Sequence, residues 1–406
     1  MSNRRAISIM GSTGSIGCSA LDVIRHANHA NHNSDAGFDV VALTAGNNAE
    51  KLAEQALEFR PQIAVIADET QLPLLETRLA GSGIEAAAGK CAVTEAATRP
   101  ARVLASIVGS AGLESTLAAV QAGNDVAIAN KESVVCGGRL ILEEAKKAGV
   151  QVLPVDSEHS AIHQCLGDGR KLEKLTITAS GGPFRTSTLD QMRAAGPAEA
   201  AAHPNWAMGI KNSIDSATLM NKSLELIEAS YLFDVPADQI DIIIHPQSII
   251  HGMAHFTDGS VIAQLGAPDM RTPISYALGW PDRITTSVER LDLVRLAKLD
   301  FEPVDGERFP AVQLAREAIA VGPGATTVLN CANESAVSAF ITGQCGFLDI
   351  SWVVKEVLSR FLSGNMAGLA CSSLEEIGLL DRYARAMAGD VLKRAPGGGA
   401  EGRTLG

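Results

Sequence analysis

The sequence contains no CxxC pair, and its seven cysteines are scattered along 406 residues. The odd count and wide spacing exclude a disulfide framework or a zinc ribbon and indicate a reducing compartment. No stretch of about 18 apolar residues occurs, so we expect no membrane-spanning helix. The apolar run before Gly11 is only five residues long, which is too short for a secretory signal, and we therefore expect a cytoplasmic protein.

Positive charge is also scarce, because the formal net charge is −12 and the isoelectric point is about 5.3. An acidic chain of this size is a poor general binder of nucleic acid, so we expect no such partner. Hydrophobic residues make up 46% of the sequence, which argues against disorder. The length leaves room for two or three domains with cores of their own.

The first 155 residues alternate short apolar runs with amphipathic stretches. The runs are rich in valine and isoleucine and apolar on both faces, as is typical of buried parallel strands. They predict strands at 6–10, 38–43, 63–67, 102–108, 125–129 and 150–155, with helices at 49–59, 112–122 and 139–148. The pattern predicts an α/β fold that begins with a Rossmann-type, doubly wound parallel sheet, and we assign residues 1–155 to this first domain.

After residue 155 the regular alternation of apolar runs and amphipathic stretches ends. Residues 156–282 hold dense polar motifs and two predicted strands, 175–178 and 261–265, and we interpret them as a central α/β catalytic domain. Little periodicity in 283–310 predicts a linker. Residues 311–394 predict a C-terminal helical bundle, with helices near 312–321, 333–342, 351–362 and 374–392. The tail, 395–406, is expected to be disordered.

A glycine-rich segment, GSTGSIG at 11–17, follows the first predicted strand and opens a helix. Gly11 allows the tight turn, Gly14 lets backbone N–H groups approach a pyrophosphate, and Gly17 lets helix and sheet pack closely. In this position the segment predicts a dinucleotide site, with a purely structural turn as the alternative. The second strand ends in LTAGNN, which has no acid to repel a 2′-phosphate and favours NADP(H), but has no arginine either.

Two carboxylates, Asp156 and Glu158, follow the predicted strand 150–155, where ligands of open α/β sheets gather. In extended chain both point to one side, and oxygen ligands alone suit Mg²⁺ or Mn²⁺. A third, Glu225, shares a predicted helix face with Asn221 and Lys222, and the three could hold phosphate, hydroxyl and metal together. The alternatives are a solvated loop for the pair and an exposed, salt-bridged helix face for Glu225.

Further polar features follow predicted strands. Lys131, after the strand DVAIA, can polarise a carbonyl or neutralise a phosphate, or belong to a plain charge cluster. Ser180 and two glycines offer an anion a hydroxyl and backbone N–H groups, or form a simple turn. The long segment 183–209 carries His203 and Trp206 and predicts a lid over a substrate, with a docked surface loop as the alternative.

Three histidines, His26, His29 and His32, recur at a spacing of three residues. Such spacing can indicate a metal site. We interpret the run instead as a polar loop inserted after the first helix.

Several motifs together resemble the 1-deoxy-D-xylulose 5-phosphate reductoisomerase family, in order from residue 7 to about residue 340: GSTGSIG, ANKES, PVDSEH, ASGGPF, HPNW, DSATLMNKSLE, HPQSIIHGM and QLGAPDMRTPI. The resemblance implies an oxidoreductase that needs NADPH and Mg²⁺, Mn²⁺ or Co²⁺. It implies rearrangement of 1-deoxy-D-xylulose 5-phosphate by retro-aldol cleavage and re-addition, then reduction to 2-C-methyl-D-erythritol 4-phosphate, in non-mevalonate isoprenoid synthesis. It also implies a homodimer, with residues 1–155 as the NADPH-binding domain and residues 156–282 as the catalytic and dimerisation domain.

The resemblance assigns roles residue by residue. The metal ligands are Asp156, Glu158 and Glu225, and the catalytic set adds Lys131 and His203. The substrate-binding positions are Lys131, Ser157, Glu158, Ser180, His203, Trp206, Ser216, Asn221, Lys222 and Glu225, with the phosphate held mainly by Ser180, Ser216, Asn221 and Lys222. The NADPH-contacting positions are Thr13, Gly14, Ser15, Ile16, Gly46, Asn47, Asn48, Asn130, Glu132 and Gly209.

Some points of the resemblance stay open. His159 and His251 match histidines near the site whose roles are less defined. Asn47 and Asn48 stand where some family members carry a basic residue, so the source of 2′-phosphate recognition is open.

Rival functions differ in the residues that they need. A semialdehyde dehydrogenase shares the glycine-rich opening but needs an activated cysteine, and no cysteine lies in the polar motifs. A simple NADP-dependent sugar-phosphate dehydrogenase does not need three metal carboxylates. A non-catalytic NADP-sensing regulator needs neither metal ligands nor a covering loop.

Overall fold

The computed structural model describes residues 4–30, 37–167, 171–202, 206, 209–364 and 366–397. The chain folds into two compact units, and each unit is assembled from separate segments. The first unit comprises 1–133, 141–164 and 269–291, and the second comprises 134–140, 165–268 and 292–406.

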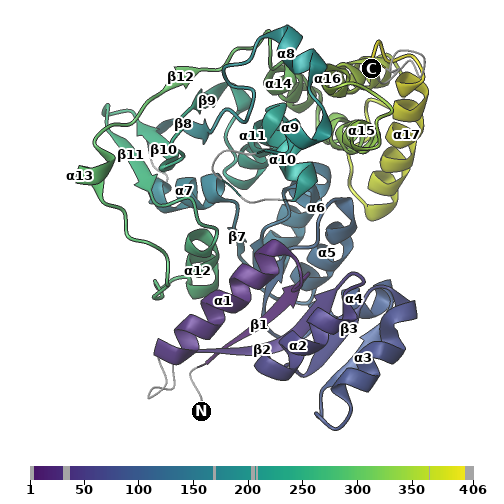
Figure 1. The fold of residues 1–406 in the computed structure, drawn as a ribbon. Coiled ribbons are helices and arrows are strands. Elements are labelled where there is room, and N and C mark those ends of the chain that lie inside the picture. Colours follow the sequence, from purple (N-terminus) through teal and green to yellow (C-terminus); the bar gives the residue numbers. More distant parts are fainter. Residues whose placement is uncertain are drawn as a thin grey trace. The chain divides into compact units, whose positions relative to one another are not determined.

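The first unit is built on a parallel sheet in the order β4-β3-β2-β1-β5-β6-β7 (Figure 1). Its strands are β1 (Arg5–Met10), β2 (Phe38–Ala45), β3 (Ile63–Ile66), β4 (Glu85–Ala88), β5 (Arg102–Ala105), β6 (Val126–Ile128) and β7 (Val152–Pro154). The central strand is β1, where Ile9 pairs with Leu43 on one side and Leu104 on the other. The strand order reverses at β1, and ligands of doubly wound sheets bind at the carboxyl ends of strands near such a switch point.

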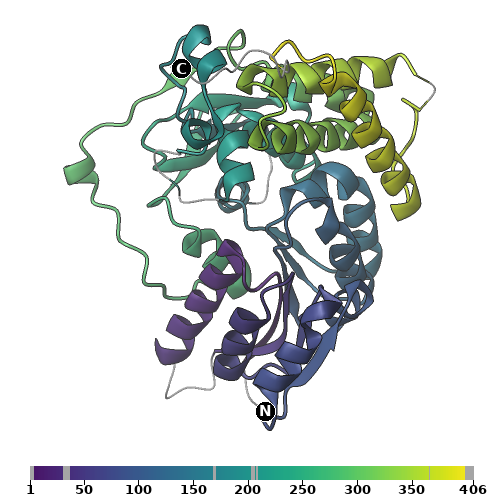
Figure 2. The ribbon, with the colours of Figure 1, turned by 45° about the vertical axis from the view of Figure 1, so that its right-hand side comes forward.

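Helices cover this sheet and confirm the predicted doubly wound α/β fold (Figures 1 and 2). They are α1 (Ser15–Ala30), α2 (Ala49–Phe59), α3 (Leu72–Leu79), α4 (Lys90–Ala97), α5 (Leu113–Gln121), α6 (Lys131–Ala148), α7 (Ser157–Leu166) and α12 (Arg271–Gly279). Residues 134–140 of α6 belong to the second unit. Helix α2 packs against α3, α4 packs against α5, and α1 packs against α12. The core is aliphatic, with Ile7, Ile24 and Leu52 fully buried.

The segment 269–291 returns to the first unit from far along the chain. Ile274 and Leu278 of α12 are buried in the same core as β1. The guanidinium of Arg102, on β5, donates to the carbonyls of Ala277 at 3.0 Å and Trp280 at 2.9 Å. These bonds satisfy carbonyls that the end of a helix leaves without an intrahelical partner, so they fasten α12 to the sheet.

The observed elements differ from the predicted ones where sequence signals are weak. Strand β4 was not predicted, because its sequence EAAA lacks β-branched residues and only its pairing with β3 makes it a strand. Helix α6 begins at Lys131, eight residues before the predicted start at 139, because the Asn130 side chain caps it there. Helix α1 continues to Ala30, so His26 and His29 lie on a helix and the predicted loop is wrong for them. His32 lies outside the described residues.

The second unit contains a mixed sheet in the order β11-β10-β8-β9-β12. Its strands are β8 (Leu172–Ala179), β9 (Ile240–Ile244), β10 (Ile250–Phe256), β11 (Val261–Leu265) and β12 (Glu302–Pro303). Among the residues that the structure describes, β8 and β9 pair in parallel and the other pairs of this sheet are antiparallel. The predicted strands 175–178 and 261–265 are confirmed within β8 and β11. Strands β9 and β10 are not among the predicted strands, because they flank the polar residues HPQS and β10 itself contains two histidines and a glycine.

Helices complete the second unit. They are α8 (Leu189–Ala194), α9 (Pro197–Ala200), α10 (Ile210–Ala217), α11 (Met220–Leu232), α13 (Leu293–Leu296), α14 (Ala311–Val321), α15 (Pro323–Ile341), α16 (Phe347–Leu362) and α17 (Leu374–Leu392). Helix α15 packs against α14, α16 and α17, which confirms the predicted C-terminal helical region (Figure 2). The predicted linker 283–310 is not featureless, because it includes α13 and β12. Within the described ranges, no helix is long and apolar enough to cross a bilayer.

Candidate active site

The glycine-rich loop joins β1 to α1 in the first unit. Gly11 has a φ of +93°, and a Cβ there would lie 2.9 Å from the Ser106 carbonyl oxygen of the neighbouring strand end. A Cβ at Gly17 would collide with the Gly11 carbonyl. The tight turn predicted at Gly11 and the close packing predicted at Gly17 are therefore confirmed. Four of the predicted NADPH-contacting residues lie in this loop and at the start of α1: Thr13, Gly14, Ser15 and Ile16.

The end of β2 lies across from this loop. Gly46, Asn47 and Asn48 are exposed there, and the Asn48 side chain accepts a hydrogen bond from the Lys51 amide at 3.0 Å, which caps α2. The Lys51 ammonium reaches the glycine-rich loop and donates to the Thr13 carbonyl at 2.9 Å. Lys51 is not among the positions that the resemblance assigns to NADPH, and nothing in the sequence shows that its side chain reaches this loop.

The carboxyl end of β6 carries Asn130 and Glu132. The Asn130 side chain accepts from the Ser133 amide at 3.0 Å and donates to the Gly109 carbonyl at 2.8 Å. Asn130 therefore ties the start of α6 to the loop that follows β5. Glu132, in the first turn of α6, is buried.

The carboxyl end of β7 carries the first two predicted metal ligands. The Lys131 Nζ atom lies 2.5 Å from Asp156 Oδ2, and the two side chains are only 12% and 13% exposed. Ser157 Oγ donates to Glu158 Oε2 at 2.6 Å, and carboxylate oxygens of Asp156 and Glu158 lie within 4.8 Å of each other. The predicted pair is thus brought together, but not by extended chain: Glu158 lies in the first turn of α7.

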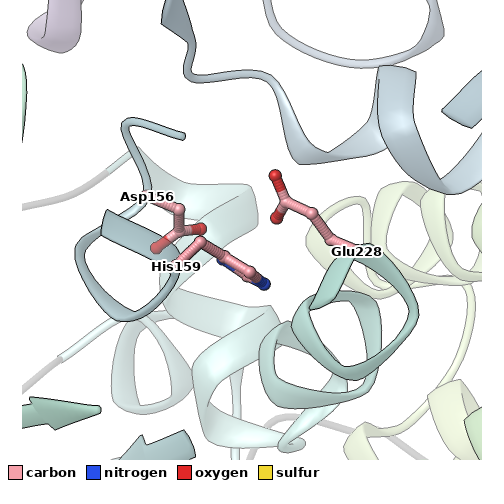
Figure 3. Close-up of side chains that lie close together, drawn as sticks. All are labelled: Asp156, His159 and Glu228. Carbon is pink, nitrogen blue, oxygen red and sulfur yellow. The ribbon is translucent and has the colours of Figure 1, made fainter. Parts of the chain in front are cut away.

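His159 extends this group within the first unit. It is fully buried on α7, and one of its ring nitrogens lies within 4.8 Å of an Asp156 oxygen (Figure 3). The resemblance places His159 near the site, and its short separation from Asp156 agrees with that.

Glu225 lies on α11 of the second unit and is fully buried. Its carboxylate accepts hydrogen bonds from the Asn221 amide and from the Lys222 ammonium, the latter at 2.7 Å. The predicted shared helix face is confirmed. The alternative of an exposed salt-bridged face is wrong, because Lys222 is also buried. Glu228, one turn further along α11 (Figure 3), is a buried carboxylate that the sequence analysis missed.

A second cluster in the same unit suits an anion. Gly181 and Gly182 have φ values of +86° and +65°, and the Ser180 hydroxyl accepts from the Gly182 amide at 3.2 Å. A Cβ at Gly182 would lie 2.7 Å from the Ser216 carbonyl oxygen, so the turn after β8 lies against the end of α10. Successive amides of such a turn form an anion-binding concavity. Asn221, in the first turn of α11, adds a helix N-terminus within the second unit.

The predicted lid, 183–209, is not one continuous loop, because α8 and α9 lie within it. The Trp206 and His251 rings lie edge to face with centroids 6.3 Å apart. Gly209 caps the start of α10. His203 lies outside the described residues, so its catalytic role stays a prediction.

The cysteines give no support to a thiol nucleophile. Five of the seven are buried, at 136, 165, 331, 345 and 371. Burial raises the pKa of the Cys165 thiol to about 11 and that of the Cys345 thiol to about 12. Thiols with such pKa values carry almost no thiolate at neutral pH and are poor nucleophiles.

Comparison with known proteins decides the family. Three family models match: 1-deoxy-D-xylulose 5-phosphate reductoisomerase at residues 7–138, its C-terminal domain at 152–233, and the DXP reductoisomerase C-terminal domain at 265–387. The chain belongs to the 1-deoxy-D-xylulose 5-phosphate reductoisomerase family. Reductoisomerases named so from Rhodospirillum centenum and Caulobacter vibrioides are each 49% identical to it, over 97% of this chain and 96% and 98% of theirs.

Solved reductoisomerase structures agree with the fold. The enzyme from Zymomonas mobilis in complex with NADPH has a TM-score of 0.89 at 44% identity, covering 96% of this chain and 100% of that one. Another, in complex with NADPH, fosmidomycin and magnesium, has a TM-score of 0.90 at 40% identity, covering 96% of this chain and 98% of that one. Membership of this reductoisomerase family excludes the rival semialdehyde dehydrogenase and NADP-sensing regulator.

Proposed function

We infer that this chain converts 1-deoxy-D-xylulose 5-phosphate to 2-C-methyl-D-erythritol 4-phosphate with NADPH, as an oxidoreductase of isoprenoid synthesis. The observation that carries the inference is identity of 49% over nearly the whole chain with enzymes of that name. The carboxylates of Asp156 and Glu158, beside the Lys131 ammonium, offer ligands for a cation and a positive charge for a substrate oxygen. NADPH, when bound, supplies the hydride of the reduction.

We propose that Asp156, Glu158 and Glu225 hold Mg²⁺ or Mn²⁺. The donor set fits, because carboxylate oxygens without sulfur ligands suit hard cations. Each half of the set is already organised: the oxygens of Asp156 and Glu158 converge, and the buried Glu225 carboxylate is oriented by Asn221 and Lys222. A cation bound there polarises the carbonyl and hydroxyl oxygens of the substrate.

The other side chains bind and orient the substrate. The Lys131 ammonium lies beside Asp156, where it can stabilise negative charge that develops on a substrate oxygen. The turn at Ser180, with Ser216, Asn221 and Lys222, is proposed to hold the phosphate of the sugar. Because these contacts lie away from the reacting carbons, they serve to position the substrate. Trp206, beside His251, is proposed to cover it and exclude water.

The direct test is NADPH oxidation in the presence of 1-deoxy-D-xylulose 5-phosphate, followed by absorbance. We expect activity with Mn²⁺ or Mg²⁺, loss of activity with EDTA, and recovery when the cation is added back. Full activity in the chelator contradicts the metal assignment. Oxidation of NADPH by a semialdehyde but not by the sugar phosphate contradicts the assigned reaction.

We also propose that two copies associate through β11. This strand ends its sheet, and Val261 and Ile262 are 50% and 49% exposed on it. An apolar edge strand is an aggregation hazard unless something covers it, and a second copy can pair with it symmetrically. The functional boundaries near 155, 282 and 310, the central dimerisation domain and a cytoplasmic location stay predictions.

Size-exclusion chromatography with light scattering measures this association. Ile262→Lys is expected to shift the protein from dimer to monomer, because a charge cannot be buried at that edge without a partner. Leu379→Lys, at a 45% exposed apolar position on α17, is the matched control and should leave the mass unchanged. A dimer that tolerates Ile262→Lys as well as the control places the interface elsewhere.

A further inference from the structure

The chain has no charged group at the two residues that end the LTAGNN run, Asn47 and Asn48. An open hollow of about 340 Å³ lies at this point, lined by Asn47, Asn48, Ala49, Glu50, Gln71 and Leu74. In a doubly wound fold, the adenosine ribose of a dinucleotide lies beside the end of the second strand. Glu50 is the only charged residue of that lining, and its charge has the wrong sign for a 2′-phosphate.

The charge of Glu50 is compensated locally. Arg78, on α3, lies 2.9 Å from it, nitrogen to oxygen. Both side chains are more than half exposed, so the pair adds little free energy, but it brings the net charge beside the hollow close to zero. A net positive charge for a phosphate at this hollow would have to come from a residue outside this pair.

Lys51 is a cation outside this pair. It lies in the first turn of α2, directly after Glu50, and its ammonium donates to the Thr13 carbonyl of the glycine-rich loop at 2.9 Å. The ammonium thus lies at the glycine-rich loop, and Lys51 itself directly follows the residues Asn47–Glu50 that line the hollow. A lysine has three N–H donors, so one bond to Thr13 leaves two for phosphate oxygens.

We propose that Lys51 recognises the 2′-phosphate and selects NADPH over NADH in this chain, in place of a basic residue at 47 or 48. The proposal rests on the proposed function, because it presumes a dinucleotide on the glycine-rich loop. The start of α2, which Asn48 caps, adds the favourable field of a helix N-terminus. Asn47 and Asn48 then leave room for the 2′-phosphate and offer it neutral hydrogen bonds, while Lys51 provides the positive charge.

Calorimetric titration of 2′,5′-ADP and 5′-AMP into the full-length protein tests this. Lys51→Gln is expected to weaken binding of 2′,5′-ADP and NADPH about tenfold or more, as loss of a charge-assisted bond does, and to leave 5′-AMP and NADH unchanged. Lys51→Arg should keep the preference. Lys90→Gln is the matched control, because Lys90 is an exposed lysine in the first turn of α4 in the same unit.

The outcomes separate this proposal from the assigned reaction. If Lys51→Gln weakens 2′,5′-ADP and 5′-AMP equally, Lys51 only supports the loop through Thr13, and the proposal is overturned. Unchanged affinity for 2′,5′-ADP overturns it as well, whereas the assigned reaction stands in both cases. If the unsubstituted protein binds neither NADPH nor 2′,5′-ADP, the proposed function itself fails. Thermal unfolding of each variant checks that it is folded.

Discussion

Replacing Glu225 by glutamine is expected to lower kcat/KM for 1-deoxy-D-xylulose 5-phosphate by about 10³-fold, while NADPH binding is kept. A cation contributes several kcal/mol of charge stabilisation to such a reaction, and each 1.36 kcal/mol corresponds to about a factor of ten in rate. Glu225 is fully buried and accepts hydrogen bonds from Asn221 and Lys222. Glutamine keeps the shape and one acceptor oxygen but removes the charge.

Two measurements separate this loss from unfolding. Thermal unfolding with and without Mn²⁺ should show stabilisation by the cation in the unsubstituted protein and none in Glu225→Gln, because a ligand stabilises only the state that binds it. Glu317→Gln, at an exposed position on α14, is the control and should retain both turnover and the Mn²⁺ effect. If Glu225→Gln instead loses NADPH affinity and keeps turnover, the residue assignments are wrong.

Replacing Lys131 by methionine is expected to cause the second large loss of activity. We expect turnover to fall about 100-fold at saturating substrate, because removal of one group that stabilises developing charge typically costs 10²–10³ in rate. The Lys131 Nζ atom lies 2.5 Å from Asp156 Oδ2, and the two side chains are 12% and 13% exposed. Since Lys131 is not a proposed metal ligand, Mn²⁺ binding should persist.

The control for Lys131 lies on the same helix. Lys146→Met changes an exposed lysine near the other end of α6 and should leave kcat unchanged. The readout is kcat together with Mn²⁺ affinity from a thermal-shift titration. Loss of Mn²⁺ binding in Lys131→Met together with turnover would assign Lys131 to holding Asp156 in place. Full turnover in Lys131→Met would remove it from the catalytic set.

The fold could be predicted where local sequence signals agree with long-range pairing. Runs of valine and isoleucine gave β2 and β3, and amphipathic spacing gave α2 at its observed bounds, Ala49–Phe59. Strand β4 escaped because four residues, EAAA, become a strand only through pairing with β3. The packing of α12 in the first unit could not be predicted either, because hydrophobic periodicity shows that a helix has a buried face but not which sheet that face covers.

The site was predictable in its residue types more than in its geometry. Spacing on a helix placed Asn221, Lys222 and Glu225 on one face, and the structure confirms their hydrogen bonds. Spacing could not tell that this face is buried. Glu158 was expected in extended chain and lies on a helix instead, yet the backbone path still brings its carboxylate to Asp156. The reach of a flexible side chain such as Lys51 has no signature in the sequence at all.

We propose that Asp156 and Glu158, two residues apart, share one divalent cation with Glu225, which lies much further along the chain. Crystals grown with Mn²⁺ and measured at a wavelength where manganese scatters anomalously test it most directly. We expect one strong anomalous peak within bonding distance of carboxylate oxygens of Asp156, Glu158 and Glu225. A peak held by other side chains, or no peak at a Mn²⁺ concentration that restores activity, would contradict it.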